Sequence, residues 1–398
     1  HGTFMLTFLV DWLNLLIRWT HFILGIGWIG ASFYFVWLDL SLRQREKMNP
    51  GVYGTSWLVH GGGFYHVEKY TVAPERLPED LHWFVWEAYL TWLTGFALLI
   101  VQYYFNASAY LIDPGVMPLQ PWEAIAISAG SLVAGWLIYD GLCRSPVGQK
   151  PALLGLAVFI VVCLAAYLYS HVFSGRAALI HVGALVGTMM AANVFMVIIP
   201  NQRKMTASLM KGEPPDPRLG QIGKQRSTHN NYLTLPVLLM MISGHYPMLY
   251  SHPQTWLIVA FILVMGAMVR HFINRADAGD DFATYSWTLL VAAVALVGAI
   301  YFTKPVERDL SAVPVPGEAE VLGILDRHCV MCHAVRPAHE GFDAPPADVV
   351  LETLPELHRF GDRVVAQAVR SNAMPLGNES GMTDEEREAL GAWIEAQK

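Results

Sequence analysis

Cys329-Val330-Met331-Cys332-His333 sets the architecture of the C-terminal part of this 398-residue chain. Covalent attachment of a c-type haem requires this C-x-x-C-H pattern, because two thiols add across the porphyrin vinyl groups and the adjacent histidine becomes an axial iron ligand. The other uses of a C-x-x-C pair are half of a zinc site and a thioredoxin-like redox pair. Neither is well supported, since the chain has no second C-x-x-C, and Cys143 and Cys163 lie far upstream in apolar segments.

A second iron ligand is expected downstream of this motif. Met374 precedes Pro375 in a loop-like run, residues 372–381, and its thioether is a natural sixth ligand that raises the reduction potential. Met382 is the competing sulfur, although it directly abuts a predicted helix. The predicted haem c site is therefore Cys329, Cys332, His333 and Met374.

The chain is expected to end in a helix. Thr383 and Glu386 form a capping box that predicts the start of this helix. Leu390 and Trp393 supply its apolar positions. A helix with C-x-x-C-H, a Met-Pro loop and a closing helix with an aromatic residue together resemble a small class I cytochrome c.

Composition divides the chain near residue 305. The whole sequence is 54% hydrophobic and 15% charged, which is not a soluble profile. Before residue 305 it contains repeated apolar runs, whereas residues 305–398 hold 17 Asp and Glu against 8 Lys and Arg. We predict a transmembrane domain over residues 5–304, with Met5 as the expected start, and a cytochrome c domain over 305–398. The acidic module could steer towards a basic partner or simply present a solvated surface.

The expected fold is all-α: a polytopic membrane helical bundle of about eight transmembrane helices with the cytochrome module at its C-terminus. Segments long enough to cross about 30 Å of hydrocarbon can be read from their apolar runs. They cover residues 9–38, 83–105, 122–142, 152–171, 177–199, 230–249, 255–275 and 284–302.

Loop charge predicts the orientation of this bundle. Connections 39–82 and 200–229 carry most of the Lys and Arg residues between the spans, whereas 106–121 and 250–254 carry none. The positive-inside rule then places both termini outside the cytoplasm. That agrees with the haem motif, because c-type haem is attached on the outer, oxidising side. The predicted location is a multi-pass plasma-membrane protein with a periplasmic cytochrome domain.

The two long basic connections contain candidate substrate residues. The first holds His60-Gly61-Gly62-Gly63-Phe64-Tyr65-His66 and Lys69. Its three glycines either let the backbone approach a ligand or form a flexible hinge. The second, residues 200–229, contains Arg203 and is predicted to be irregular.

Histidines within the membrane are candidate haem ligands, because ionisable residues there are costly and mark function. His21 and His181 lie beside glycines that would let a flat macrocycle approach, at matching depth near the outer face. They could ligate a b-type haem, or each could merely hydrogen-bond a neighbouring helix. His245 is a reserve ligand. On the inner side, His229 and His271 could hold a second haem or face a substrate.

Three motifs and the fused cytochrome resemble the bacterial membrane-bound urate oxidase (urate hydroxylase) family over residues 9–397. The motifs are the His60 to His66 stretch, Leu81-His82-Trp83-Phe84-Val85-Trp86-Glu87-Ala88-Tyr89 and Thr228-His229-Asn230-Asn231-Tyr232-Leu233-Thr234-Leu235-Pro236. The resemblance implies an oxidoreductase of the bacterial inner membrane that converts urate to 5-hydroxyisourate. Electrons would pass through the cytochrome to a downstream cytochrome c or terminal oxidase. The expected partners are urate and the lipid membrane, with no nucleic acid.

The chemistry of urate oxidation sets what the residues must supply. The oxygen is expected from water, since both axial positions of the haem are filled. The reaction then needs an anion-binding group and a base, for which His60, His66, Lys69, Glu87 and Arg203 are the candidates on the cytoplasmic side.

Two other classes of function stay open from sequence. One is a quinol-to-cytochrome electron relay without a polar substrate. The other is a permease with a tethered redox domain, in which the sixth segment, interrupted by Pro236 and Gly244, forms part of a path. Prompt cytochrome reduction by urate without quinol would distinguish the oxidase from both.

Overall fold

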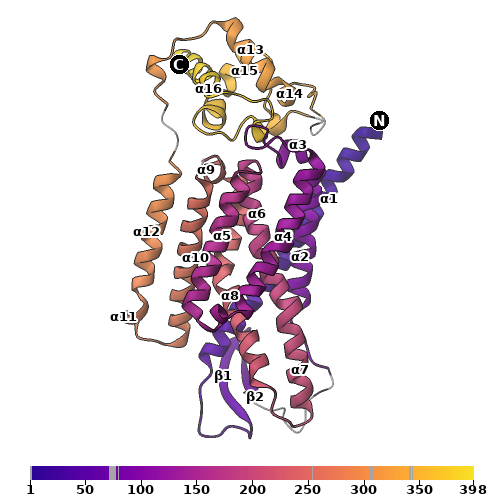
Figure 1. The fold of residues 1–398 in the computed structure, drawn as a ribbon, viewed down its shortest axis with the longest axis vertical. Helices are drawn as coiled ribbons and strands as arrows, with labels where there is room; N and C mark the ends of the chain where they lie inside the picture. Colours follow the sequence, from indigo (N-terminus) through magenta and orange to yellow (C-terminus); the bar gives the residue numbers. More distant parts are fainter. Residues whose placement is uncertain are drawn as a thin grey trace.

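The computed structural model describes residues 2–70, 78, 80–252, 254–304, 308–339, 342 and 344–398. Over these residues the chain is mostly helical, and long helices form a bundle with a smaller C-terminal module at one end (Figure 1). The predicted boundary between 304 and 305 falls at residues 305–307, which lie outside the described residues.

The bundle consists of twelve helices in the described part of the chain. In order they are α1 (Gly2–Ser41), α2 (Trp86–Leu99), α3 (Ala107–Tyr110), α4 (Pro121–Arg144), α5 (Pro151–Ser170), α6 (Gly175–Ala192), α7 (Ile199–Met210), α8 (Pro217–Ile242), α9 (Pro247–Tyr250), α10 (Thr255–Ala278), α11 (Phe282–Tyr285) and α12 (Trp287–Phe302). A π-helical segment, Ile100–Tyr104, continues α2, and another, Asn193–Ile198, joins α6 to α7. The C-terminal module contains α13 (Glu318–His328), α14 (Val330–His333), α15 (Leu354–Val364) and α16 (Asp384–Ala396).

Six helices of the described chain are long and apolar enough to cross a membrane. They cover Phe8–Ser41, Pro121–Arg144, Pro151–Ser170, Gly175–Met210, Thr255–Ala278 and Phe282–Phe302. The other two predicted spans, 83–105 and 230–249, correspond to α2 and α8. Helix α2 has only 14 residues before its π-helical turn, and α8 begins with a polar half. The prediction of about eight spans is thus supported for six helices.

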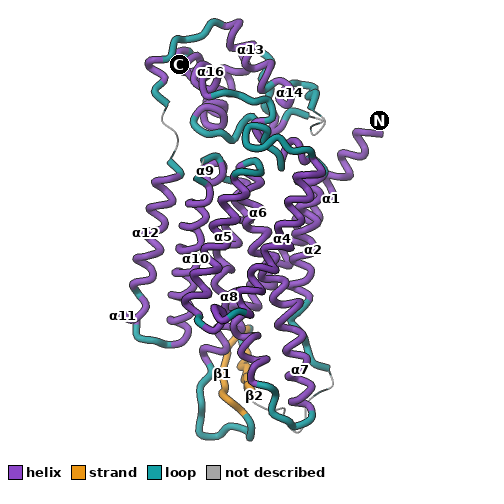
Figure 2. The backbone as a smooth tube through the Cα atoms, viewed as in Figure 1, coloured by secondary structure: helices purple, strands orange, loops and turns teal. Residues whose placement is uncertain are grey.

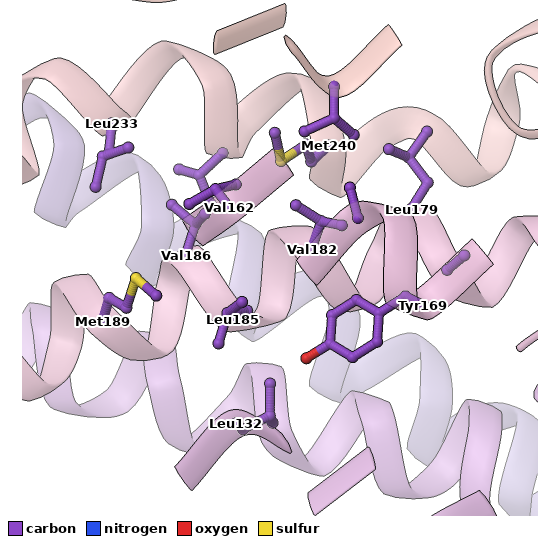
Figure 3. Packing of buried hydrophobic residues seen from close by; sticks show 14 of the residues in the cluster. Leu132, Val162, Tyr169, Leu179, Val182, Leu185, Val186, Met189, Leu233 and Met240 are labelled. Atoms are coloured by element: carbon purple, nitrogen blue, oxygen red, sulfur yellow. The ribbon is translucent and has the colours of Figure 1, made fainter. Parts of the chain in front are cut away.

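Helix α6 forms the centre of the bundle. Leu179, Val182, Leu185, Val186 and Met189 are at most 2% exposed. Figure 3 shows them packed among side chains from α4, α5 and α8, including those of Leu132, Val162, Tyr169, Leu233 and Met240. The C-terminal module has its own core of buried side chains, drawn from residues 321–394.

A β-hairpin departs from the all-α expectation. Strands β1 (Val52–His60) and β2 (Gly63–Tyr70) pair antiparallel, with His60 opposite Gly63. Gly61 and Gly62 form the two-residue turn between them with φ of +58° and +79°. Positive φ at both positions is the type I′ geometry that matches the twist of paired strands. The glycine run is therefore a turn, rather than a ligand loop or a hinge.

The prediction that residues 200–229 are irregular is wrong. Helix α7 ends at Met210 and α8 already begins at Pro217, so the connection is short. Asp216 caps α8 by accepting a hydrogen bond from the backbone of Arg218, and Pro217 occupies the first helical position, where it is tolerated. Pro214 and Pro215 do lie in the non-helical connection, but the helices on both sides continue beyond the apolar region and leave only residues 211–216 outside them.

The two basic connections lie at the same end of the bundle. Figure 2 shows the strands of the hairpin and the end of α7 opposite the C-terminal module. This is the relative placement that the charge pattern predicts.

Candidate functional site

The C-x-x-C-H motif lies where α13 meets α14. The His333 Nδ1 nitrogen is 2.8 Å from the carbonyl oxygen of Val349, and the Leu351 N–H donates to the His333 carbonyl at 2.8 Å. Such a bond on one ring nitrogen orients the imidazole and leaves Nε2 for a metal. Burial lowers the pKa of His333, which favours the neutral form that coordinates iron.

Cys329 and Cys332 are free thiols. Burial raises the pKa of Cys329 to about 12 and that of Cys332 to about 11. A redox-active pair needs a thiolate near neutral pH, which this burial opposes. In the described part of the chain, no group of three or more His, Cys, Asp or Glu side chains gathers as a bare metal ion would require. The raised pKa values argue against a reactive dithiol, and haem attachment by this pair stays a prediction.

Both candidate sulfur ligands belong to the module. Met374 is half-buried against the module core, and its backbone is fixed at two points: its N–H donates to Gln367 at 2.9 Å and its carbonyl accepts from Arg387 at 2.6 Å. Met382 is 4% exposed and lies inside the core. Cys329, Cys332, His333 and Met374 fit a covalently attached haem, and the choice of Met374 over Met382 stays a prediction.

The capping box that starts α16 is confirmed. The Thr383 side chain accepts from the Glu386 N–H at 3.3 Å, and the Glu386 carboxylate accepts from the Thr383 N–H at 3.0 Å. Burial alone would raise the pKa of Glu386. The hydrogen bond from Thr383 and the neighbouring Arg327 and His328 outweigh it and lower that pKa to about 2.

The two outer histidines pack between helices. His21 Nδ1 is 2.9 Å from the carbonyl oxygen of Thr91 and 3.0 Å from the hydroxyl of Thr94 on α2. His181 is fully buried, with Nε2 2.7 Å from the Ser128 hydroxyl and Nδ1 2.7 Å from the Ala177 carbonyl. Because both nitrogens of His181 are bonded to protein, this arrangement does not fit an axial haem ligand.

Two of the glycines near these histidines face side chains of neighbouring helices. A Cβ on Gly27 would lie 3.8 Å from Glu87 Cγ, and one on Gly183 would lie 3.1 Å from Met240 Cβ. Small residues at such positions let membrane helices approach closely. Gly27 and Gly183 thus serve helix packing, whereas a Cβ on Gly30 would meet nothing within 4 Å among the described residues, so a macrocycle beside these histidines stays a prediction.

The remaining histidine candidates have different surroundings. His229 Nδ1 is 2.7 Å from the Tyr139 hydroxyl, and His271 Nδ1 is 2.6 Å from the Tyr232 hydroxyl. His245 is exposed in a 3₁₀ turn after α8. The inner histidines therefore belong to separate tyrosine pairs, and their role as haem ligands or substrate contacts stays a prediction.

A cavity of about 130 Å³ lies between α1, α2, α6 and α8. Its polar lining comes from Ser32, Glu87, Ser227, Asn230 and Thr234, and its aromatic lining from Trp28, Phe35 and Phe84. Glu87 is the one predicted catalytic residue in this wall. The cavity lies near the end of α1 and the start of α2, which flank the β-hairpin. Arg203 lies exposed on α7.

Three predicted catalytic residues lie on the hairpin instead. His60 ends β1, and His66 on β2 stacks on Trp57 with ring centroids 4.4 Å apart. Lys69 Nζ bonds Asp39 Oδ1 at 2.7 Å and so ties the hairpin to α1. These side chains form local contacts and are not in the cavity wall.

A buried polar network that sequence reasoning missed adjoins the cavity. Asn193 is fully buried and donates to the Asn230 side chain and to the Tyr139 hydroxyl, both at 2.9 Å. Arg226, 2% exposed, donates to Asn193 at 3.3 Å and to Asp140 at 2.7 Å. Its members come from three separate segments, so the sequence carries no local signal for this network.

A second buried cation lies on α10. Arg270, 1% exposed, donates from Nε to the side chain of Asn231 at 2.5 Å, and its guanidinium lies 3.8 Å from the ring centroid of Phe33. Its Nη2 is buried with no hydrogen-bond partner among the described residues. Arg270 is therefore a candidate anion-binding group, although it is not part of the cavity lining.

Comparison with known protein families matches residues 7–303 to the family described as urate oxidase, N-terminal. The searches of curated proteins and of solved structures found no match. The matched range contains the hairpin, the cavity and the buried polar network, and it stops before the C-x-x-C-H module. Because the match spans well over half of the chain, this protein belongs to the urate oxidase N-terminal family.

Proposed function

We propose that this protein oxidises urate to 5-hydroxyisourate in its membrane domain and passes the electrons to a c-type haem held by Cys329 and Cys332. The observation that carries the proposal is the family match over residues 7–303 in a chain that also contains C-x-x-C-H. The proposed setting is the bacterial inner membrane, with the module in the periplasm and urate arriving from the cytoplasm. The shared end of the two basic connections supports this orientation.

The electron count fits a haem acceptor. Converting urate to 5-hydroxyisourate adds one hydroxyl group from water and releases two electrons and two protons. The bound haem would supply a one-electron acceptor, so each urate requires two transfers. Water is the proposed oxygen source because His333 and Met374 would fill both axial positions. The protein must therefore bind the purine, accept protons and exclude competing reactions.

The cavity beside Glu87 is the proposed substrate site. The Glu87 carboxylate can accept a proton, while the Asn230 amide and the Thr234 hydroxyl can pair with the N–H and carbonyl groups of a purine. A cavity of about 150 Å³ holds a single benzene ring, so a bicyclic purine needs more room. Phe35 and Phe84, which contact each other at a 4.7 Å centroid distance and are partly exposed, are placed to move aside.

Arg270 is the proposed counter-charge for urate, which is an anion near neutral pH. Burial in low dielectric strengthens the attraction between a cation and an anion. The other buried cation of this region, Arg226, is already paired with Asp140 at 2.7 Å. Each of these arginines has one buried nitrogen without a hydrogen-bond partner, but Arg270 has no ion pair among the described residues, so it is better able to bind an added anion.

The test is anaerobic addition of urate to the oxidised protein, followed by the haem spectrum and product analysis. We expect prompt haem reduction without quinol, and label in 5-hydroxyisourate from oxygen-18 water. Glu87→Gln should remove urate-driven reduction, whereas Glu46→Gln, which changes an exposed carboxylate after α1, should not. Label from oxygen gas, or stoichiometric hydrogen peroxide, would contradict the mechanism. Reduction by quinol alone would favour an electron relay, and urate transport without reduction a permease.

A further inference from the structure

The C-terminal module contacts the membrane domain through the loop that follows Met374. Gly377 has φ of +61°, and a Cβ at this position would lie 2.8 Å from the carbonyl oxygen of Ile112 and 3.2 Å from that of Ala109. Figure 1 shows α3 beside the module, at the end of the bundle away from the hairpin. Only a residue without a side chain allows the two backbones to approach this closely.

Charged groups from both domains meet at this contact. A cavity of about 340 Å³ is lined by Asp113 of the membrane domain and by Asn378 and Arg387 of the module. Arg387, 2% exposed, donates to the carbonyls of Ala368 and Met374 at 2.6 Å, and to Asn378 Oδ1 at 3.3 Å. One buried cation thus fixes the loop around Gly377 and faces an acidic residue across the contact.

Tyr110 is an aromatic side chain at the same contact. Its ring centroid lies 6.5 Å from that of Phe342 in the module, and the Arg176 guanidinium lies 5.4 Å from its ring. The Phe342 N–H donates to the His339 carbonyl at 3.1 Å, and the His339 N–H donates to the Met331 carbonyl at 3.0 Å. Tyr110 therefore contacts a segment of the module that is bonded to the C-x-x-C-H motif.

The aromatic contacts continue inward from Tyr110. The Tyr103 ring lies 6.3 Å from the ring of Tyr110 and 5.9 Å from that of His181, in edge-on arrangements. Tyr103 and His181 are 4% and 0% exposed. Closely spaced rings thus lead from His181, near the end of the bundle that faces the module, to the module itself.

We propose that α3 and residues 111–115 form a permanent docking surface for the C-terminal module, and that electrons cross from the membrane domain to the haem at the Tyr110 contact. Each transfer moves one electron lost by urate to the haem, and the Tyr110 ring is a bridge that is left unchanged. The origin of the electrons rests on the proposed function, whereas the docking does not. Gly377 is a positioning residue in this scheme.

Gly377→Ala and Gly381→Ala form a matched pair. Gly381 also has positive φ, +67°, but a Cβ there would meet nothing within 4 Å, so both variants carry similar backbone strain and only the first clashes with α3. In full-length haem-loaded protein, Gly377→Ala should speed hydrogen exchange at residues 107–115. It should also slow urate-driven haem reduction by about 10- to 100-fold, because a small displacement of the module from α3 separates the groups between which electrons pass. Gly381→Ala should do neither.

Tyr110 variants test the bridge separately. Tyr110→Leu should slow urate-driven reduction more than Tyr110→Phe, which keeps the ring, while the haem content and midpoint potential stay the same. Equal exchange and equal rates in Gly377→Ala and Gly381→Ala would overturn the docking, and equal rates in the two Tyr110 variants would overturn the bridge. If urate fails to reduce the wild-type haem, the proposed function is wrong. The docking surface is then tested only by comparing hydrogen exchange in Gly377→Ala and Gly381→Ala.

Discussion

At the scale of single residues, His181 illustrates how burial and partners set the use of a side chain. The sequence pairs it with His21 as a possible ligand of haem b. In the fold its two nitrogens are bonded to Ser128 and Ala177, and binding iron would require one of these buried hydrogen bonds to break.

We therefore expect the pyridine haemochrome spectrum of purified, active protein to contain c-type bands alone. His181→Ala should destabilise the membrane domain by about 1–3 kcal/mol, because it removes the two hydrogen bonds to Ser128 and to the Ala177 carbonyl, and the covalent haem should stay attached. Bands of b-type haem that disappear in His181→Ala would show that the buried ring ligates iron after all.

The two methionines of the module should respond differently to truncation. Met374→Ala is expected to lower the reduction potential, because loss of the thioether removes the ligand that favours reduced iron. Met382→Ala should instead cost about 2–5 kcal/mol of module stability, since it opens a cavity in the core. Redox titration and chemical denaturation of both variants measure the two effects. The opposite ranking of potentials would assign Met382 as the ligand.

At the scale of secondary-structure elements, the capping box at the start of α16 should make the stability of the module depend on pH. The folded-state pKa of Glu386 is lowered to about 2 from the ordinary value of 4.5. A lowered carboxyl pKa contributes stability above the ordinary pKa and loses it as pH falls towards the folded-state value.

Module stability should therefore decline between about pH 4.5 and pH 2. Glu386→Gln should flatten this decline and lower the stability at neutral pH, because the bonds to Thr383 and Arg327 weaken. Glu385→Gln, an exposed neighbour in the same turn, is the control and should keep the wild-type profile. Denaturant titrations across this pH range measure the free energy of unfolding of the wild type and the two variants. The same dependence of this free energy on pH in all three proteins would refute the role of Glu386.

The β-hairpin offers a second test at this scale. No atom outside the local chain lies within 4 Å of a Cβ on Gly61 or Gly62, so substitutions there act through backbone conformation alone. Gly61→Asn should be tolerated, because Asn adopts the first position of a type I′ turn. Gly62→Val should cost about 1–2 kcal/mol, since a β-branched residue resists positive φ. Limited proteolysis of the hairpin should rank the variants in that order.

At the scale of the whole molecule, the proposed substrate cavity and the haem module lie in opposite halves. The cavity lies near the hairpin, and the module contacts α3 at the other end (Figure 1). In the proposed scheme, the rings of His181, Tyr103 and Tyr110 and the docking surface around Gly377 cover the part of this gap nearest the module.

The two domains have separate cores, so their unfolding should be separable. Met382→Ala should lower the midpoint of the transition seen by haem absorbance and leave the midpoint of the membrane-domain transition nearly unchanged. Calorimetry in detergent, with haem absorbance recorded in parallel, would measure both midpoints. A single transition that shifts as a whole would mean that docking couples the two domains into one cooperative unit.

Local chemistry could be read directly from the residues of this chain. The C-x-x-C-H motif and the Thr383 cap each depend on side chains a few positions apart, and the six long apolar spans depend on composition. The hairpin was missed because a glycine run is also typical of ligand loops and hinges. The fold class and the family resemblance were therefore accessible, whereas the two-stranded element was not.

Contacts between distant segments needed the tertiary structure. Asp140, Asn193 and Asn230 come from α4, the π-helical segment after α6, and α8, and no local pattern predicts that they meet. The same holds for Gly377 against the Ile112 carbonyl and for the partners of His181. Periodicity reports which face of a helix is apolar, but the close packing of one helix on another decides which polar groups find partners.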